Sequence, residues 1–259
     1  EEIVLKLKNK MIVICLIFFM LISISAVSAQ NNNSDIITTN NNDDDTISVI
    51  DLNNEILKAN PGSFAQLNAT INGGSQSIEL DRDYAYSSSD AIKDGIVINT
   101  DNLTIDGKGH TIDAKGQSRI FYVNSTTVYL KNIKFINGNA ANAGAVYGYG
   151  DNLRVINCTF INNNATGWGG AIYSYPDSLA VFVNSTFINN NAKYGGAILT
   201  VYGYRQYIIN CTFESNQATD YGGAVGVYGT QPYTERPYDD RVDIIGSTFI
   251  NNKAKYGDA

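Results

Sequence analysis

The residues of this chain that come closest to a catalytic group lie in one short segment, residues 106–115. It holds two carboxylates, Asp106 and Asp113, and three basic side chains, Lys108, His110 and Lys115. Carboxylates that bind calcium beside a basic proton acceptor could attack a polysaccharide, and a carboxylate pair could hydrolyse a glycosidic bond. Asp-Gly-Lys-Gly is also an ordinary turn sequence, and the single His of the chain stands at its end. We favour the turn, expect no catalytic residues, and keep a polysaccharide lyase or glycoside hydrolase as the alternative.

Two aspartate runs could hold a cation, but both are typical of solvated loops. Asp43, Asp44 and Asp45 stand in an Asn-rich stretch, and Asp239-Asp240 stands in a proline-containing insertion. The calcium-binding nonapeptide that begins Gly-Gly-x-Gly-x-Asp does not occur in the repeats, where Ala follows each Gly doublet. We therefore expect no metal and no cofactor.

Composition narrows the class of protein further. The 259 residues are 44% hydrophobic and 17% charged, so the chain can bury a core and wholesale disorder is excluded. Gly, Asn, Tyr, Ser and Thr crowd out the helix formers, which favours a single repetitive domain. The formal net charge is -7, which excludes nucleic acid as a partner, because binding phosphates requires clustered Lys and Arg.

The first 29 residues have the three parts of a secretion signal. Three lysines among residues 6–10 precede an apolar run at 11–22, and small residues then end in Val27-Ser28-Ala29. A membrane anchor is the alternative, but the run is shorter than the ~20 residues that span a bilayer. We expect a signal peptide at 1–29, a solvated Asn/Asp-rich linker at 30–46, and a protein that is secreted or held at the cell surface.

A repeat of about 26 residues fills the second half of the chain. Its copies begin at Asn157, Asn184, Asn210 and Ser247, with a diverged copy from Ile133, and NSTFINNNAKYGGAILTV is typical. The unit alternates with period two between turn residues, and no helical period or leucine-rich spacing competes. Since one unit cannot bury its own apolar face, we predict that each strand–turn–strand unit stacks on the next at ~4.8 Å in a parallel β-helix.

Single residue types recur at fixed positions of the repeat, as columns of a stack require. The anchor phenylalanines are Phe135, Phe160, Phe187, Phe213 and Phe249. Successive members are 25, 27, 26 and 36 residues apart, and the long last spacing predicts a loop inserted at 229–240. Five residues after each Phe comes an alanine, which fits a corner where rungs approach closely: Ala140, Ala165, Ala192, Ala218 and Ala254. Asparagines share one turn, where Asn tolerates left-handed backbone and its amide can bond its counterparts: Asn162, Asn163, Asn189, Asn190, Asn216, Asn251 and Asn252. Gly169, Gly195 and Gly222 each open a Gly-Gly bend, and Asp258 in the last copy predicts a changed turn there.

Residues 47–94 are predicted to form an N-terminal cap that covers the first rung, together with the first strands. Ser63 and Gln66 have capping-box spacing ahead of Phe64, Leu67 and Ile71, which predicts a short amphipathic helix. Such a helix would protect the unpaired backbone at the end of a stack. The rungs themselves are expected at 95–259.

The F-x-N-N-x-A…G-G-A-[IV] units resemble the repeats of polymorphic outer-membrane proteins. Together with LTIDGKGHTIDA, they are similar to adhesin-like proteins of methanogenic archaea, over roughly Phe64 to the end. The resemblance implies an all-β fold, a right-handed parallel β-helix with a short N-terminal capping helix, displayed at the cell surface for adhesion. The chain lacks an initiator Met and stops within a repeat, so we expect both ends to be fragment boundaries.

Three functions remain open at this point. The first is a non-enzymatic surface adhesin that contacts a carbohydrate or a cell-surface protein; the others are the enzyme named above and a purely structural surface-layer component. We expect no nucleic-acid partner, and membrane attachment only through the signal peptide or a C-terminal anchor absent here. An uncovered last rung would also allow end-to-end self-association.

The repeats predict which face makes the contacts. Counting from the second Gly of each bend, Val146, Ile172, Ile198 and Val225 are assigned inward, so positions three and five point outward. Those positions hold Tyr147, Tyr173 and Leu199, then Tyr149, Tyr175, Val201 and Tyr228. We expect an exposed aromatic stripe that binds sugar rings or partner aromatics, or else tyrosine ladders that only stabilise the sheet.

Two further expectations concern modification. Cys158 and Cys211 share a column but are separated by Ser185, which puts their Cα atoms ~9.6 Å apart, beyond the ~7 Å limit for a disulfide, so we predict free thiols. Asn-x-Ser/Thr sequons, which could be glycosylated in an exported protein, begin at Asn32, Asn68, Asn102, Asn124, Asn157, Asn164, Asn184 and Asn210. Those in the NCT and NST steps are expected to be occluded between rungs.

Overall fold

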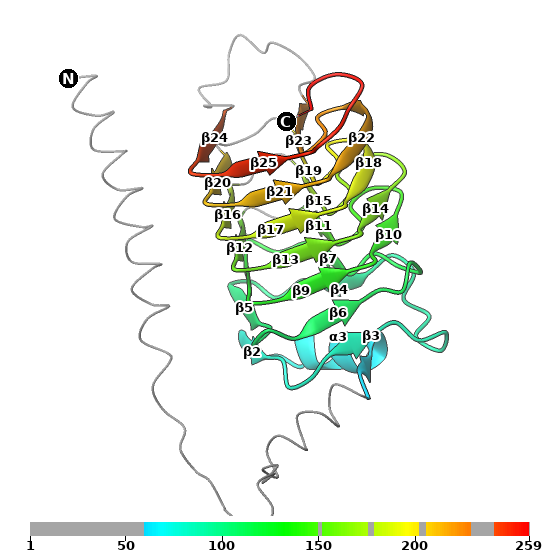
Figure 1. Cartoon of the computed structure of the whole chain (residues 1–259). Helices are drawn as coiled ribbons and strands as arrows, with labels where there is room; N and C mark the ends of the chain where they lie inside the picture. The colour runs from blue at the N-terminus through cyan, green and yellow to red at the C-terminus, as the bar shows by residue number, and fades with distance from the viewer. Residues whose placement is uncertain (1–59, 150–151, 176–178, 202–205, 229–240, 259) are drawn as a thin grey trace, which may run out of the picture. The chain divides into compact units, whose positions relative to one another are not determined.

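The computed structural model describes residues 60–149, 152–175, 179–201, 206–228 and 241–258 (Figure 1). Contacts divide the chain into two units, Glu1–Leu52 and Asn53–Ala259, and every described residue belongs to the second. The predicted signal peptide, the linker with its aspartates and the inserted loop at 229–240 therefore lie outside the described residues. So do residues 47–59 of the predicted cap.

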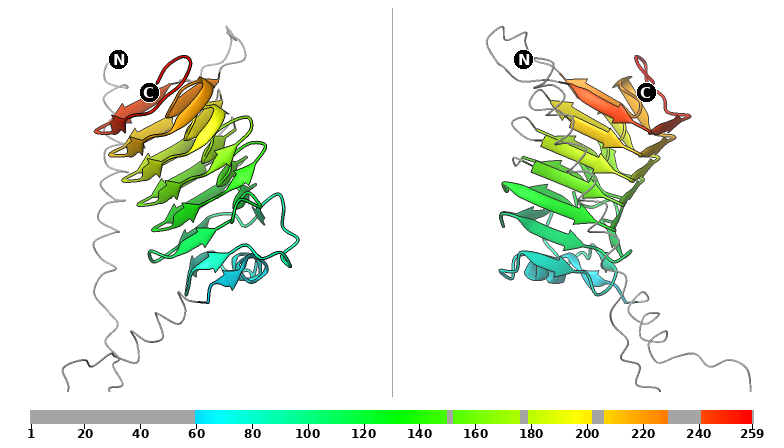
Figure 2. Two further views of the ribbon diagram at one scale, coloured as in Figure 1. Left: turned by 45° about the vertical axis from the view of Figure 1, so that its right-hand side comes forward. Right: turned by 90° about the vertical axis from the view of Figure 1, so that its left-hand side faces the viewer.

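The described chain is a parallel β-solenoid of about six turns, as predicted (Figures 1 and 2). Sheet A contains β1 (Gly62–Ser63), β3 (Tyr84–Ala85), β6 (Thr111–Asp113), β9 (Lys134–Ile136), β13 (Thr159–Ile161), β17 (Thr186–Ile188), β21 (Thr212–Glu214) and β25 (Thr248–Ile250). Sheet B contains β2 (Ser77–Glu79), β5 (Leu103–Asp106), β8 (Thr127–Lys131), β12 (Asn152–Ile156), β16 (Leu179–Val183), β20 (Gln206–Ile209) and β24 (Val242–Ile245). Sheet C contains β4 (Ile96–Ile98), β7 (Phe121–Val123), β11 (Val146–Gly148), β15 (Ile172–Ser174), β19 (Ile198–Val201) and β23 (Val225–Tyr228). Sheet D contains β10 (Asn139–Ala140), β14 (Asn164–Ala165), β18 (Asn191–Tyr194) and β22 (Gln217–Tyr221).

A complete rung passes through one strand of sheet C, then B, A and D, and so has four short strands where the repeat pattern predicts two. The corners on either side of the sheet A strand are single residues in the left-handed region of backbone conformation. Asn157 has φ 53° between β12 and β13, and Asn162 has φ 55° between β13 and β14. Asn tolerates this conformation, and a one-residue corner leaves the period-two alternation almost undisturbed. The sequence pattern therefore predicts the turn at Asn162 and misses the corner at Asn157.

The predicted phenylalanine column is confirmed at the centre of the core. Phe135, Phe160, Phe187, Phe213 and Phe249 pair in register along sheet A. Neighbouring ring centroids are 4.8 to 4.9 Å apart, and the planes differ by 4° to 11°. One aromatic ring per rung thus fills the interior continuously at the rung spacing.

A ladder of buried asparagines runs beside these rings, as predicted. Asn163, Asn190 and Asn216 are fully buried. The Oδ1 of Asn190 accepts from both the backbone N and the Nδ2 of Asn163, each at 3.0 Å. The Nδ2 of Asn163 also donates to the carbonyl oxygen of Phe135 at 3.2 Å, and the pattern repeats through Asn252. Every buried amide is therefore satisfied by the rung before it and the rung after it.

The Gly-Gly bends allow the closest approach of neighbouring rungs. Gly169, Gly195 and Gly222 have φ between 61° and 66°, and a Cβ on Gly170 would lie 2.1 Å from the carbonyl oxygen of Gly196. The alanine column lies beside them, with Ala165, Ala192 and Ala218 at 1% to 2% exposure. In the last copy Gly257 keeps φ 67°, so the change of turn expected from Asp258 does not occur at this residue.

The predicted cap helix is α3 (Phe64–Ile71), and its capping box is present. The hydroxyl of Ser63 accepts from the backbone N of Gln66, whose side chain accepts from the backbone N of Ser63. Phe64, Leu67 and Ile71 are fully buried against the first rung. Figure 1 shows the helix beneath the first strands of the stack.

The opposite end of the described solenoid is formed by β24 and β25. Ile244 is 47% exposed, although its register partner Ile208 is fully buried. Self-association through this edge stays a prediction.

The asparagine ladder gives a test of what holds the rungs in register. Replacing Asn190 with Ala leaves the amide groups of Asn163 and Asn216 without their partners inside the core, so the free energy of unfolding should fall by about 2–4 kcal/mol. Urea denaturation followed by circular dichroism measures this change. The matched variant Asn191→Ala removes a partly exposed amide of the next column and should cost about 0.5 kcal/mol or less. Equal losses in the two variants would contradict a special role for the buried ladder.

Candidate functional site

The prediction of which side chains of sheet C point inward is confirmed. Val146, Ile172, Ile198 and Val225 stand in register along sheet C, and all four are buried in the main core. The intervening side chains therefore point away from that core, as the alternation predicts.

The outward side chains do not form the flat exposed stripe that we expected. Tyr149, Tyr175 and Tyr228 are 51%, 38% and 41% exposed, whereas Tyr173 is only 1% exposed and Tyr147 is half-buried. Leu199 and Val201 are also buried, at 2% and 9%. The prediction that these side chains point outward is confirmed. The prediction that they are exposed is wrong for Tyr173, Leu199 and Val201.

The middle of the face is buried because residues ahead of the Gly-Gly bends fold back over it. Tyr173, Leu199 and Val201 form a second apolar cluster with Ala143, and Trp168, Tyr194 and Tyr147 pack against it. The Trp168 ring lies 5.3 Å from that of Tyr173 and 5.6 Å from that of Tyr228. A single indole thus fills the space left where Leu199 and Val201 replace tyrosines.

The remaining rings form a surface with exposed edges. Tyr149 and Tyr175 stack at 5.3 Å with planes 28° apart, so each covers one face of the other. Tyr147 meets Tyr173 edge-on at 5.0 Å, and the guanidinium of Arg119 lies 5.1 Å from the Tyr147 centroid. We call the exposed rings of Tyr149, Tyr175 and Tyr228 the tyrosine rim; Tyr147 and Tyr173 are the platform behind it.

Sequence reasoning missed a further aromatic column at the corner between sheets D and C. Each aromatic residue stands directly before a Gly doublet or its equivalent: Trp168, Tyr194, Tyr221 and Tyr256. Tyr221 and Tyr256 stack at 5.0 Å and are 52% and 49% exposed. The signal was present in the recurring pair of an aromatic followed by Gly, which we read only as a turn.

Burial changes the chemistry of the platform tyrosines. Burial raises the pKa of Tyr147 and, more strongly, that of Tyr173, with the neighbouring tyrosines as the second cause. The Tyr173 hydroxyl is buried and has no hydrogen-bond partner in the described structure. These hydroxyls are therefore neutral packing groups.

The candidate catalytic carboxylates are occupied by turn hydrogen bonds. Asp106 Oδ1 accepts from the backbone N of Lys108 at 2.9 Å and from the Nδ2 of Asn132 at 2.9 Å. Asp113 Oδ1 accepts from the backbone N of Lys115 at 2.8 Å and from the Nδ2 of Asn137 at 2.9 Å. Each carboxylate fixes a corner and joins it to the next rung.

The basic residues of this segment are paired separately. Lys108 contacts Glu79 at 2.7 Å, Lys115 contacts Asp113 at 2.7 Å, and His110 lies 3.0 Å from Asp83. Among the described residues, no group of three or more His, Cys, Asp or Glu side chains could hold a metal ion.

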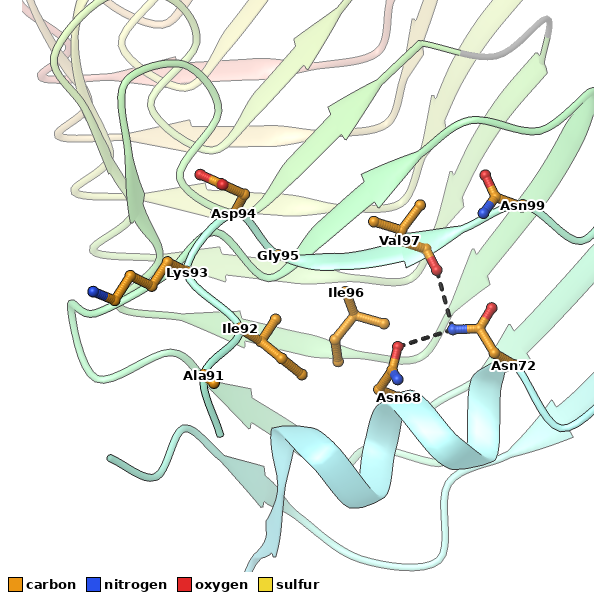
Figure 3. A pocket seen from close by; sticks show the side chains of 10 residues that line it. All are labelled: Asn68, Asn72, Ala91, Ile92, Lys93, Asp94, Gly95, Ile96, Val97 and Asn99. Carbon is orange, nitrogen blue, oxygen red and sulfur yellow. Dashed lines mark hydrogen bonds between the residues drawn. The ribbon is translucent and has the colours of Figure 1, made fainter. Parts of the chain in front are cut away.

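A pocket of about 410 Å³ lies between α3 and the edge strand β4 (Figure 3). Asn68 and Asn72 of the helix and Asn99 after β4 line one side, and the loop at 91–95 lines the other. None of these residues belongs to the 26-residue repeats. Sequence reasoning singled out only Asn68, as the start of a sequon, and did not expect a pocket here.

The asparagines of the NCT and NST sequons are exposed, contrary to expectation. Asn157, Asn184 and Asn210 occupy the corner between sheets B and A, where the left-handed backbone turns them outward. The middle residues, Cys158, Ser185 and Cys211, are the buried ones.

Comparison with known proteins assigns the repeats. A family model described as the Chlamydia polymorphic membrane protein repeat matches residues 157–175, 184–201 and 210–227. Each match runs from a corner asparagine through strands of sheets A and D to a strand of sheet C. No curated protein and no solved structure shows significant similarity to the chain. Within the described part of the chain, no helix has the length and apolar character needed to cross a membrane.

The buried thiols give a direct test of the rung register. Cys158 and Cys211 are free and 1% exposed, as predicted, and burial raises their pKa to about 12 and about 11. Because the thiolate is the reactive form, neither should react with a disulfide reagent at pH 8 in a folded Cys15→Ser variant. Both should react once denaturant is added. A mass spectrum that shows a bridge between them would contradict the register.

The Tyr173 hydroxyl gives a test of the buried platform. Tyr173→Phe removes a buried group that has no partner, so the free energy of unfolding should rise by about 1 kcal/mol. Tyr149→Phe removes an exposed hydroxyl and should change it by about 0.5 kcal/mol or less. Urea denaturation compares the two variants, and a clear loss of stability in Tyr173→Phe would show that its hydroxyl does have a partner.

Proposed function

We propose that this chain, a parallel β-solenoid that carries polymorphic membrane protein repeats, is a non-enzymatic cell-surface adhesin. The family of these repeats is associated with the outer membrane or the cell surface, which supports an exported, surface-bound location. Stacked rungs supply a rigid rod, and one lateral face supplies the contacts. The partner is a glycan or a protein of a host or neighbouring cell.

The tyrosine rim is the observation that carries this proposal. Tyr149, Tyr175 and Tyr228 lie at the carboxyl ends of β11, β15 and β23, and each exposes between 38% and 51% of its surface. Behind them the packed platform fixes the ring positions, so little conformational entropy is lost when a ligand binds. Tyrosine combines a large apolar area with a polar hydroxyl, and such residues are enriched in the energetically dominant parts of interfaces.

Two observations support a non-catalytic role. The carboxylates Asp106 and Asp113 already hold turn and inter-rung hydrogen bonds. Their basic neighbours are held in separate pairs: Lys108 with Glu79, His110 with Asp83 and Lys115 with Asp113. A catalytic acid or base needs a free lone pair or proton directed at the substrate. The hydrogen bonds to their Oδ1 atoms fix both carboxylates in the turns and orient them for joining rungs.

A purely structural surface-layer role is favoured by a different observation. The rim rings Tyr149 and Tyr175 stack on each other, which is also what a stabilising cross-strand ladder does, at ~0.2–1 kcal/mol per pair. The two functions differ in their response to mutation, because a ladder loses stability and an adhesive rim loses binding.

The triple variant Tyr149→Ser, Tyr175→Ser and Tyr228→Ser separates the two. We expect adhesion to fall about tenfold or more while the β-rich circular dichroism spectrum is retained, because exposed aromatic anchors dominate binding energy. Binding of labelled protein to glycan and host-protein arrays, and then to cells, measures the loss. The matched control is Tyr221→Ser with Tyr256→Ser, which removes equally exposed rings from the neighbouring corner column. Unchanged adhesion in the folded triple variant would overturn the assignment of the rim, and loss only in the control would move the site to the corner column.

A further inference from the structure

We infer that the pocket beside the cap helix binds the end of a short neutral saccharide, whose following units lie along the tyrosine rim. The pocket assignment stands on its own geometry. The continuation along the rim rests on the proposed function.

The wall of the pocket is held in place by the second rung. Ala91 and Gly95 have φ 51° and 91°, so the loop between them turns sharply at both ends. Arg119 Nη1 donates to the Asp94 carbonyl at 2.9 Å, and Ser118 Oγ donates to the Ile92 carbonyl at 2.7 Å. The pocket is therefore formed before any ligand arrives.

The opposite side presents three amides, each fixed at one end. Asn72 Nδ2 donates to Asn68 Oδ1 at 2.9 Å and to the Val97 carbonyl at 3.1 Å, and Asn99 Oδ1 accepts from Asn124 Nδ2 at 3.2 Å. These bonds orient the amides and leave the Oδ1 of Asn72 and the Nδ2 of Asn68 and Asn99 for a ligand. Figure 3 shows the three side chains on the side of the pocket that faces Lys93 and Asp94.

The chemistry of this lining selects a neutral ligand rich in hydroxyl groups. Lys93 and Asp94 cancel in charge, and Asp94 is the one carboxylate among the residues that line the pocket. A hydroxyl can donate and accept at once, so it suits both the free oxygen and the free amide groups. Ile92 and Val97, which are partly exposed, supply aliphatic surface for the C–H face of a ring. The volume of 410 Å³ is at the lower end of the ~300–1,000 Å³ typical of small-ligand sites, which fits one or two sugar units.

The pocket is continuous with the rim through the register of sheet C. Val97 pairs with Tyr122, and Tyr122 pairs with Tyr147. In the adjacent column, the amide of Asn99 contacts that of Asn124 in the next rung, and beyond it the column continues as Tyr149 and Tyr175. A saccharide that leaves the pocket along the stack therefore meets amides first and exposed tyrosines next.

An extended peptide that adds to the free edge of β4 is the rival occupant, since edge strands commonly bind peptides in this way. It is disfavoured because Asn72 already occupies the Val97 carbonyl, which a peptide strand would need.

Titrations with cello- and N-acetylchito-oligosaccharides test the inference, using the disaccharide and the hexasaccharide of each series. Chemical shifts of the asparagine side-chain amides should move saturably with a disaccharide of at least one series. Asn68→Ala and Asn99→Ala should each weaken that binding about three- to tenfold, the loss expected for one hydrogen bond. Asn139→Ala, an exposed amide on sheet D that donates to the Gly116 carbonyl, is the matched control and should have no effect. Circular dichroism confirms that each variant is folded.

The hexasaccharide separates the pocket from the rim. It should bind more tightly than the disaccharide, and Tyr149→Ser with Tyr175→Ser should remove only that gain. Sensitivity to the tyrosines but not to the asparagines would overturn the pocket and leave the proposed function standing. Sensitivity to the asparagines alone would support the pocket and count against the rim. No saturable shift with any of the four sugars, or displacement of a bound sugar by an extended Val-Thr heptapeptide, would overturn the pocket inference.

Discussion

The buried ladder from Asn163 to Asn252 is the interaction on which the rest of the solenoid depends. A primary amide is suited to this place because it can accept two hydrogen bonds and donate two, and the stacked rungs offer that number of partners. Any slip of one rung against the next would leave a buried amide unpaired beside an apolar ring, at a cost of about 1–3 kcal/mol per group. The ladder thereby sets the register, and the stacked phenylalanines add apolar burial in the register that it sets.

Once the register is fixed, identical positions become columns on the outside as well. This is why tyrosines that stand in successive repeats become neighbours at about 5 Å, and why amides at the start of sheet C lead into rings further along. The outer surface of such a protein is therefore patterned in one dimension, along the stack. This linear pattern is the reason that we propose a ligand with its own linear repeat.

The sequence predicts the stack well and its outer surface less well, for a physical reason. Inward positions of every repeat obey one constraint, close packing around a shared axis, so the columns of Phe160 and Ala165 could be assigned from their recurrence alone. Recurrence also predicted the asparagine ladder, but not that Asn190 is its buried member and Asn189 the corner residue. Exposure depends also on what folds over a face, and the covering residue Trp168 differs from its counterpart Tyr194 in the next repeat. Tyr173 was therefore placed on the correct side of the sheet and wrongly expected to be exposed. The pocket could not be predicted at all, since Asn68, Asn99 and the loop at 91–95 belong to no repeat and are joined only by the fold.

The hydrogen-bonded polar groups of the rungs differ from the groups that we propose for binding. Along the interior and at the corners, carboxylates and amides are consumed in joining one rung to the next, as Asp106 and Asp113 show. A group that already carries the fold contributes little to a ligand, because its hydrogen bonds would have to be broken before new ones form. The surfaces that we propose for binding are instead the exposed rings of the tyrosine rim and the amides beside the cap helix. The tyrosine rim lies on the repeats themselves. The amides of Asn68 and Asn72 belong to the cap helix at the start of the stack.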